Sequence, residues 1–300
     1  MRTTKRFTPD LLDRYRAIGR GLGTYEHYVP WHRVSRSDPS SLGRSHLMIW
    51  RQRQRELLSD DEWVAALFTT MANDVDDLRE QFPLALTDAS HELGAYDVRL
   101  AVPNLPGTIE VARNLGIRHP RVNGNGRSAP WVMTTDLLIT LVDVNEGRRL
   151  LAVSCKSGRP DDRRTKELLR IERHYWTVRG VAWLMLTPDL YEESVELTLR
   201  NSMHWALGEP VSDAAKKTAT TVATEFVGLS LVSTLDCLER TLGGSGDLDL
   251  ARRAFWQAVW SGELCLDLRR GWRPHLPTSF LSPAAFLSLN PIASRRSAWN

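Results

Sequence analysis

Apolar positions recur with helical spacing in some segments of the chain and form short runs or alternations in others. Recurrence every three or four residues predicts amphipathic helices, whereas runs and alternations of about four to eight residues predict strands. The predicted helices cover residues 8–18, a segment that starts at Ser59, and residues 108–116, 162–179, 190–207, 212–241 and 247–260. The predicted strands cover residues 131–142, 149–156 and 181–187, and residues 75–86 are predicted to form a strand or an extended segment.

The strand pattern predicts one buried sheet. Residues 131–142 and 149–156 should form a hairpin that turns near Asn145–Gly147, and residues 181–187 (VAWLMLT) are wholly apolar, as in a strand covered on both faces. Helices lie between and around these strands, which is the pattern of an α/β domain.

The remaining segments carry break signals. We expect residues 24–55 to be irregular and rich in aromatic and basic side chains, residues 87–107 to form an inserted surface loop, and the Gly/Asn-rich stretch 120–130 to be a loop. Gly208 and Pro210 interrupt the helical pattern and mark the best domain boundary. The helices beyond them, followed by a short strand pair, predict a small, mainly helical, winged-helix-like domain.

Charge is distributed unevenly. Residues 1–55 hold 12 Lys/Arg against 4 Asp/Glu, whereas residues 56–100 hold 2 against 11, although the whole chain is only +3. A basic arm beside an acidic block fits a site that handles polyanions with carboxylate-held metal, and two solvated surfaces are the simpler explanation. We therefore predict three parts: a basic segment 1–55, an α/β domain 56–208 and a C-terminal domain 209–300.

Composition narrows the class of protein. The chain has 300 residues, of which 42% are hydrophobic and 25% charged, so a largely disordered chain is excluded. No apolar run is long enough to cross a membrane, and the first residues lack the apolar core of a secretory signal. Three cysteines without metal-ligand spacing indicate reduced thiols and a cytoplasmic protein.

Asp136 and Lys156 lie on neighbouring predicted strands. Asp136 points away from the apolar face of its strand, and Ser154 and Lys156 do so on theirs, so the hairpin should bring the three together. A carboxylate beside a lysine is the core of a metal-dependent phosphodiesterase, in which the carboxylate holds Mg²⁺ and the lysine orients or deprotonates water. The alternative is a surface ion pair.

The basic residues single out Lys156. The chain has 34 Arg and 5 Lys, and Lys156 is the only lysine between Lys5 and Lys166. An ammonium is compact and its pKa can shift, which a guanidinium cannot match.

A metal site of this kind needs a second carboxylate. Glu62 borders the inward face of the helix that starts at Ser59, but Ser59-x-x-Glu62 is also a capping box. Glu80 is the rival candidate, and spacing alone does not decide between them.

Several short motifs, in the correct order, resemble the TnsA-type transposon endonucleases over about residues 15–205, and the C-terminal third is similar in outline to the helix-turn-helix domain of that family. The motifs are GRGLGTYEHYVPWHRV (19–34), GRSH (43–46), LLSDDEW (57–63), DDLREQFPL (76–84), IRHP (117–120), VMTTDLLIT (132–140), AVSCK (152–156) and LLRIERHYW (168–176).

The resemblance implies a restriction-endonuclease-like mixed sheet flanked by helices. By similarity, Glu62 and Asp136 are the catalytic, metal-binding carboxylates and Lys156 is the catalytic lysine. The family cuts the 5′ ends of a mobile DNA element, a TnsB-like transposase cuts and joins the 3′ ends, and a TnsC-like ATPase binds the C-terminal domain. We expect Mg²⁺ as the cofactor, with Mn²⁺ able to substitute. Ser154 departs from the Gln, Glu or Asp common at its position, which weakens the case for a second metal.

Most other polar residues are explained by structural or surface roles and not by catalysis. The four histidines His46, His91, His119 and His174 fit no metal spacing, and His119 is expected to fix a loop. Glu167 and Glu172 read as a solvated helix face. The arginines expected to contact DNA phosphates are Arg44, Arg51, Arg53 and Arg55, with Arg33 and Arg36 as further candidates.

Two rival functions stay open on the sequence. One is a stand-alone restriction-type or repair nuclease of the same fold. The other is an inactive adaptor that recruits a transposase without cutting.

Overall fold

The structure is a computed structural model that describes residues 6–35, 38, 44–143, 147–243, 247–270 and 273–299. Its contacts group the chain into two compact units. The first comprises residues 1–63, 74–187 and 298–300, and the second comprises residues 64–73 and 188–297.

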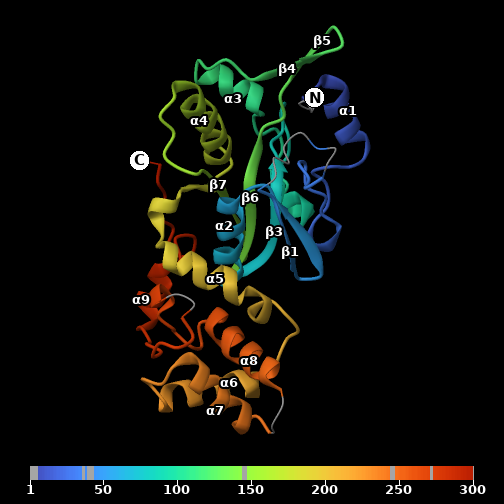
Figure 1. The fold of residues 1–300 in the computed structure, drawn as a ribbon. Coiled ribbons are helices and arrows are strands. Elements are labelled where there is room, and N and C mark those ends of the chain that lie inside the picture. Colours follow the sequence, from blue (N-terminus) through green and yellow to red (C-terminus); the bar gives the residue numbers. More distant parts are fainter. Residues whose placement is uncertain are drawn as a thin grey trace, which may run out of the picture. The chain divides into compact units, whose positions relative to one another are not determined.

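A four-stranded mixed sheet forms the centre of the first unit (Figure 1). Its strand order is β3-β6-β7-β8, in which β3, β6 and β7 are antiparallel neighbours and β8 runs parallel to β7. The strands are β3 (Val75–Pro83), β6 (Thr134–Asp143), β7 (Gly147–Cys155) and β8 (Ala182–Leu186). All four predicted strands are therefore confirmed, while the turn expected near Asn145 lies outside the described residues.

Helices flank this sheet. α4 (Arg163–Thr177) places Ile171, Tyr175 and Trp176 in one core cluster with Leu138 and Ala152 of the sheet. The mixed α/β class predicted from the sequence is confirmed. The other elements of the unit are α1 (Pro9–Ala17), the start of α2 (Asp60–Thr70), α3 (Thr108–Asn114), and the short 3-10 helices η1 (Tyr25–His27), η2 (Glu92–Ala95) and η3 (Val98–Leu100).

Two hairpins lie where loops were expected. Residues 24–55, predicted to be irregular, contain β1 (His46–Trp50), which pairs with β2 (Arg53–Leu57). Residues 120–130 form the hairpin of β4 (Arg121–Gly124) and β5 (Arg127–Pro130). Asn125 and Gly126 connect its strands with φ of 52° and 71°, the left-handed values of a tight hairpin turn, so this Asn-Gly pair was the signal for a hairpin rather than a loop.

The inserted segment 87–107 is more than a surface loop. The Tyr96 hydroxyl donates to Asp77 at 2.8 Å and accepts from Thr140 Oγ1 at 2.9 Å. Glu92 accepts from Arg179 Nε at 3.0 Å. These bonds tie the segment to the sheet and to the end of α4, although Val98 stays 82% exposed.

Helices dominate the second unit. They are α5 (Glu193–Ala206), α6 (Asp213–Glu225), α7 (Leu231–Thr241), α8 (Leu248–Trp260) and α9 (Pro283–Leu289), with η5 (Leu268–Arg270). η4 (Pro188–Leu190) precedes α5. Single β-bridges join Ser230 to Pro277 and Leu266 to Phe280, which gives a sparse version of the predicted strand pair.

The units divide the chain differently from the predicted ranges. α5 packs on α8 and η5, so it belongs with the C-terminal helices, and residues 64–73 join them. A functional boundary near residue 208 stays a prediction.

Candidate active site

Asp136 and Lys156 meet at one end of the sheet. The register pairs Leu137 with Val153, so Asp136, one residue earlier in β6, lies beside the end of β7. Lys156 Nζ lies 3.0 Å from Asp136 Oδ2 and donates to the Cys155 carbonyl at 2.8 Å. The Cys155 backbone N–H donates to the same Asp136 oxygen at 2.7 Å. The hairpin expected from the sequence thus brings the carboxylate and the lysine together.

Glu62 lies in the same cluster, at the start of α2. Its Oε2 accepts the Leu58 N–H at 2.8 Å, and its own N–H donates to Ser59 Oγ at 3.2 Å, so the capping box is formed. The Gln81 amide donates to Glu62 Oε2 at 3.0 Å and reaches Asp136 Oδ1 at 3.5 Å. Glu62 therefore serves as a cap and also faces Asp136 across one amide.

Gln81 was missed by sequence reasoning. It sits within β3 at φ 49°, a left-handed value that is uncommon for a residue with a side chain. Its neighbours Glu80 and Phe82 pair with Leu137 and Thr135, so Gln81 lies level with Asp136 on the adjacent strand. Only the pairing register shows this, because a lone glutamine in a strand carries no signal of its own.

The carboxylates shape the electrostatics of the site. Burial, followed by the charge of Asp136, raises the pKa of Glu62 to about 8. Burial alone would lower the pKa of Lys156, but Asp136 and Glu172 outweigh it and raise that pKa above its usual value. The site therefore holds Lys156 as the ammonium.

Ser154 does not point to Asp136. Its hydroxyl donates to Glu172 Oε2 at 3.2 Å. Oε1 of Glu172 accepts from Thr135 Oγ1 at 2.9 Å and Trp183 Nε1 at 3.2 Å. Glu172 is buried in α4, so reading it as part of a solvated helix face was wrong. Burial first, and the charge of Asp136, raise its pKa to about 7, although Lys156 acts in the opposite direction.

Comparison with known proteins identifies the family of the chain. Residues 72–188 match the family model described as TnsA-like endonuclease N terminal. The chain is also 30% identical over 233 residues to the Transposon Tn7 transposition protein TnsA of Escherichia coli, which covers 76% of this chain and 69% of that protein. The chain belongs to the TnsA-like endonuclease family.

Family membership makes this TnsA-like chain a transposition endonuclease, a class that works on DNA together with a transposase. The matched range 72–188 contains Asp136, Lys156 and Glu172, whereas Glu62 lies ahead of it. In the described part of the chain, no helix is long and apolar enough to cross a membrane.

Glu80, the rival carboxylate, forms an ion pair with Arg53 in the first unit. Its two oxygens accept from Arg53 at 2.6 Å each, and the Glu56 N–H donates to it at 3.1 Å. It is fully buried in this ion pair. The geometry therefore favours Glu62 as the partner of Asp136.

Two of the predicted DNA contacts are corrected by their burial. Arg53 and Arg55 are 7% and 1% exposed, and both donate to the Leu78 carbonyl inside the unit. They cannot reach a phosphate without unfolding the hairpin. Arg44 and Arg51 are exposed and remain candidates, while Arg36 lies outside the described residues.

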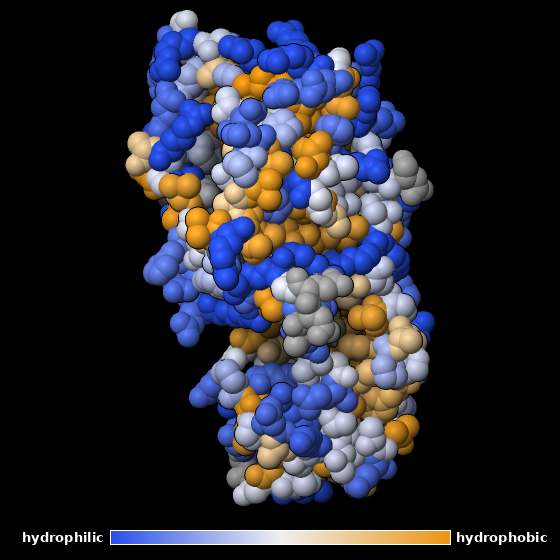
Figure 2. All heavy atoms as spheres, turned by 180° about the vertical axis from the view of Figure 1, so that it is seen from behind, coloured by the Kyte–Doolittle hydropathy of each residue, from blue (hydrophilic) through white to orange (hydrophobic). Residues whose placement is uncertain are grey.

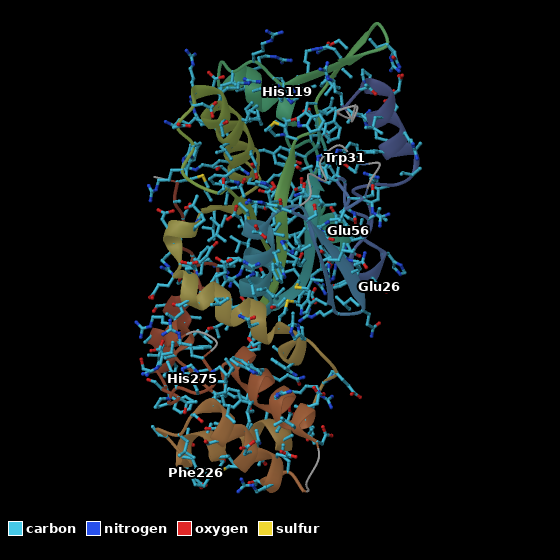
Figure 3. All side chains as sticks on the ribbon, viewed as in Figure 1. Glu26, Trp31, Glu56, His119, Phe226 and His275 are labelled. Carbon is cyan, nitrogen blue, oxygen red and sulfur yellow. The ribbon has the colours of Figure 1, made fainter. Side chains whose placement is uncertain are left out.

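His46 joins the hairpin β1–β2 to the start of α2. Its Nε2 lies 2.7 Å from Asp60 Oδ1, and its ring stacks on Trp63 with centroids 4.2 Å apart. These contacts sit on either side of Glu62 in the sequence. Glu56, labelled in Figure 3, lies in the same hairpin and binds Arg33 Nε at 2.6 Å.

The donor set fits a hard divalent cation. Mg²⁺ is commonly bound by one or two carboxylates together with water and substrate phosphates, and Glu62 and Asp136 supply two. Burial and, after it, the charge of Asp136 raise the pKa of Glu62, and a cation held by both carboxylates would favour their charged forms. Among the residues that the structure describes, no group of three His, Cys, Asp or Glu side chains forms a denser metal site.

Proposed function

We propose that the chain is a Mg²⁺-dependent DNA endonuclease that cuts the 5′ ends of a transposon. The observation that carries this proposal is the cluster in which Gln81 bridges Glu62 and Asp136 while Lys156 binds Asp136. Family membership supports the endonuclease activity, and the cluster supplies the side chains that phosphodiester hydrolysis needs.

Each side chain has a distinct task in this proposal. Glu62 and Asp136 hold Mg²⁺, or Mn²⁺ in its place, and the metal supplies charge stabilisation at the phosphate. Gln81 keeps the two carboxylates together, and Lys156, held as an ammonium, orients the attacking water and the phosphate oxygens. The negative charge of Glu172 stabilises that ammonium. Ser154 keeps Glu172 in place through its hydroxyl.

The C-terminal helices fit a protein partner better than DNA. α8 follows α7 as a recognition helix follows its partner in a helix-turn-helix, yet its only exposed residue is Asp249, whose negative charge opposes contact with DNA. Arg253 and Gln257 of α8 bind the chain around Glu209. The helix that would enter a groove is thus covered, and we assign residues 209–300 to binding a TnsC-like ATPase, with a TnsB-like transposase cutting the 3′ ends.

Substitution of the two carboxylates tests the proposal. Asp136→Ala and Glu62→Gln should each abolish metal-dependent nicking of transposon-end DNA in the presence of the transposase, because a neutral group does not hold the cation. Both proteins should stay folded by circular dichroism. Glu62→Gln keeps the size of the side chain and a polar group that can fill the same place in the capping box, so it should change stability by less than about 1 kcal/mol.

Three outcomes separate the alternatives. Full activity in Glu62→Gln would make Glu62 a cap only. Cutting of any DNA without the transposase would favour a stand-alone nuclease. Absence of metal-dependent nicking in the wild-type chain, with transposase binding retained, would identify an adaptor.

The three described cysteines are unpaired, in keeping with our placement of the reaction in the reducing cytoplasm.

A further inference from the structure

The hairpin β4–β5 projects from the end of the first unit that carries α1 and α3 (Figure 1). None of its residues from Arg121 to Pro130 is buried. Hydrophilic side chains dominate this end of the unit in the space-filling view (Figure 2). The ribbon therefore has surface that is open to a partner.

One face of the hairpin is fastened to α1. Arg127 binds Asp10 at 2.7 Å and Asp13 at 3.0 Å, and the Asn125 amide donates to Asp10 at 2.7 Å. Gly124 lies so close to Thr8 that an added Cβ would approach its methyl carbon to 2.7 Å. These contacts hold the ribbon in one orientation.

The opposite face carries polar side chains with unused hydrogen-bonding capacity. Arg121, Asn123 and Ser128 alternate with the fastened positions along the two strands, and all three are exposed. Arg121 Nε donates to Ser128 Oγ at 2.9 Å, which spreads the guanidinium across the ribbon. Arginine and asparagine are the side chains that contact phosphates and base edges in DNA grooves.

The charge of this region is complementary to DNA. Residues 111–135 contain four arginines and no aspartate or glutamate. Asp10 and Asp13 of α1 offset Arg127 on the fastened face, so the remaining positive charge is that of Arg113, Arg118 and Arg121. His119, labelled in Figure 3, lies next to the ribbon. Burial lowers the pKa of His119, and the positive charges of Arg164 and Arg121 lower it further. Both guanidinium groups therefore contribute positive potential at His119.

The ribbon is continuous with the strand of the catalytic aspartate. β5 ends at Pro130 and β6 begins at Thr134, two residues before Asp136. Val122 and Trp131 pack against the core cluster of Leu12, Tyr15, Trp31 and Val132, which makes the connection stiff. A ligand held on the ribbon therefore has a fixed position relative to Asp136.

We propose that the free face of the hairpin β4–β5 binds the DNA duplex beside the cleaved bond, with Arg121 and Asn123 as the contacting residues. This inference rests on the proposed nuclease function. The major groove is about 12 Å wide and accepts a two-stranded β-ribbon. The ribbon would thereby determine which phosphate of the bound duplex lies at Asp136.

The test compares two variants of the full chain with the wild type. Arg121→Ala with Asn123→Ala should lower nicking of transposon-end duplex by about tenfold at limiting enzyme, because one or two groove contacts are lost. Raising the enzyme concentration should restore the rate, since the reacting groups are intact. Arg99→Ala removes one exposed charge from the segment 87–107, where it pairs with Asp97, and should stay within about twofold of the wild type.

Photo-crosslinking reports on the contact itself. A photoreactive residue at position 123 should crosslink to the duplex, whereas one at position 98, which is highly exposed in the wild type, should not. Normal nicking by the double variant, or a crosslink from position 123 to the transposase instead of DNA, overturns the inference while the nuclease function stands. Failure of the wild type to nick any DNA overturns the nuclease function, and a DNA crosslink from position 123 would still support the duplex contact.

Discussion

At the scale of single residues, Lys156 is defined by its neighbours rather than by its type. Its ammonium binds Asp136 and the Cys155 carbonyl, and Glu172 adds a further negative charge. The carboxylate–lysine pair could be predicted from the sequence because both residues break the apolar pattern of their strands. The third carboxylate could not, because Glu172 follows a helical pattern in which a buried acid and an exposed one look alike.

Lys156→Arg should be nearly as damaging to nicking as Lys156→Ala. The ammonium makes two bonds within 3.0 Å, and the larger, planar guanidinium cannot reproduce both. Single-turnover nicking with Mg²⁺ and the transposase measures this, and near-normal rates in Lys156→Arg would reduce the role of Lys156 to neutralising charge.

Glu172→Gln should change how stability depends on pH. The folded chain raises the pKa of Glu172 from 4.5 to about 7, so the folded state keeps a proton that the unfolded state loses between these values. The stabilisation from this proton is complete below pH 4.5 and is lost as the pH rises to 7. Glu172→Gln removes this loss, and melting curves should show it gaining stability over the wild type from pH 5 to pH 8, by at most roughly 3 kcal/mol. An equal difference at both pH values would contradict the assignment.

At the scale of elements, the start of α2 is positioned by the hairpin β1–β2. His46 binds Asp60 and stacks on Trp63, and these two residues flank the turn that carries Glu62. The sequence did not predict this hairpin, because positive φ values at Arg51 and Gln52 are needed to close it and neither residue is a usual turn former.

His46→Ala should lower the nicking rate several-fold while costing about 1 kcal/mol of stability, since a hydrogen bond and a ring contact are lost together. His46→Phe keeps only the ring contact and His46→Gln keeps only a hydrogen-bonding group, so the pair separates the two contributions. Unchanged rates in all three variants, with a lowered melting temperature, would confine His46 to a structural role.

At the scale of the whole molecule, the compact units do not follow the order of the chain. The second unit takes residues 64–73 from the middle of the first, and Asn290 donates to the Phe68 carbonyl at 2.7 Å within it. The sequence suggested a cut at Gly208 because glycine and proline end the helical pattern there. Such a pattern locates the end of a helix but not the surface on which that helix packs.

A chain that ends at residue 208 should therefore be less stable than the full chain. α5 would lose α8 and η5, and its buried Val195, Leu199 and Ser202 would become exposed. We expect the chain of residues 1–208 to melt at a lower temperature and to bind a hydrophobic dye. The control is a chain shortened only after Ser297, where the second unit ends. A cooperative, unshifted melting curve for residues 1–208 would restore the sequence boundary as a domain boundary.

By itself the sequence determined the α/β class, the four strands of the central sheet, and the pairing of Asp136 with Lys156. These depend on local periodicity and on one hairpin, which short-range physics specifies. The tertiary structure alone favoured Glu62 over Glu80 as the partner of Asp136. It also showed that Arg53 and Arg55 are buried, and that Gln81 and Glu172 lie at the site. The reason is that burial of a charged side chain depends on which distant partner compensates its desolvation, and that partner is fixed only when the strands and helices have packed.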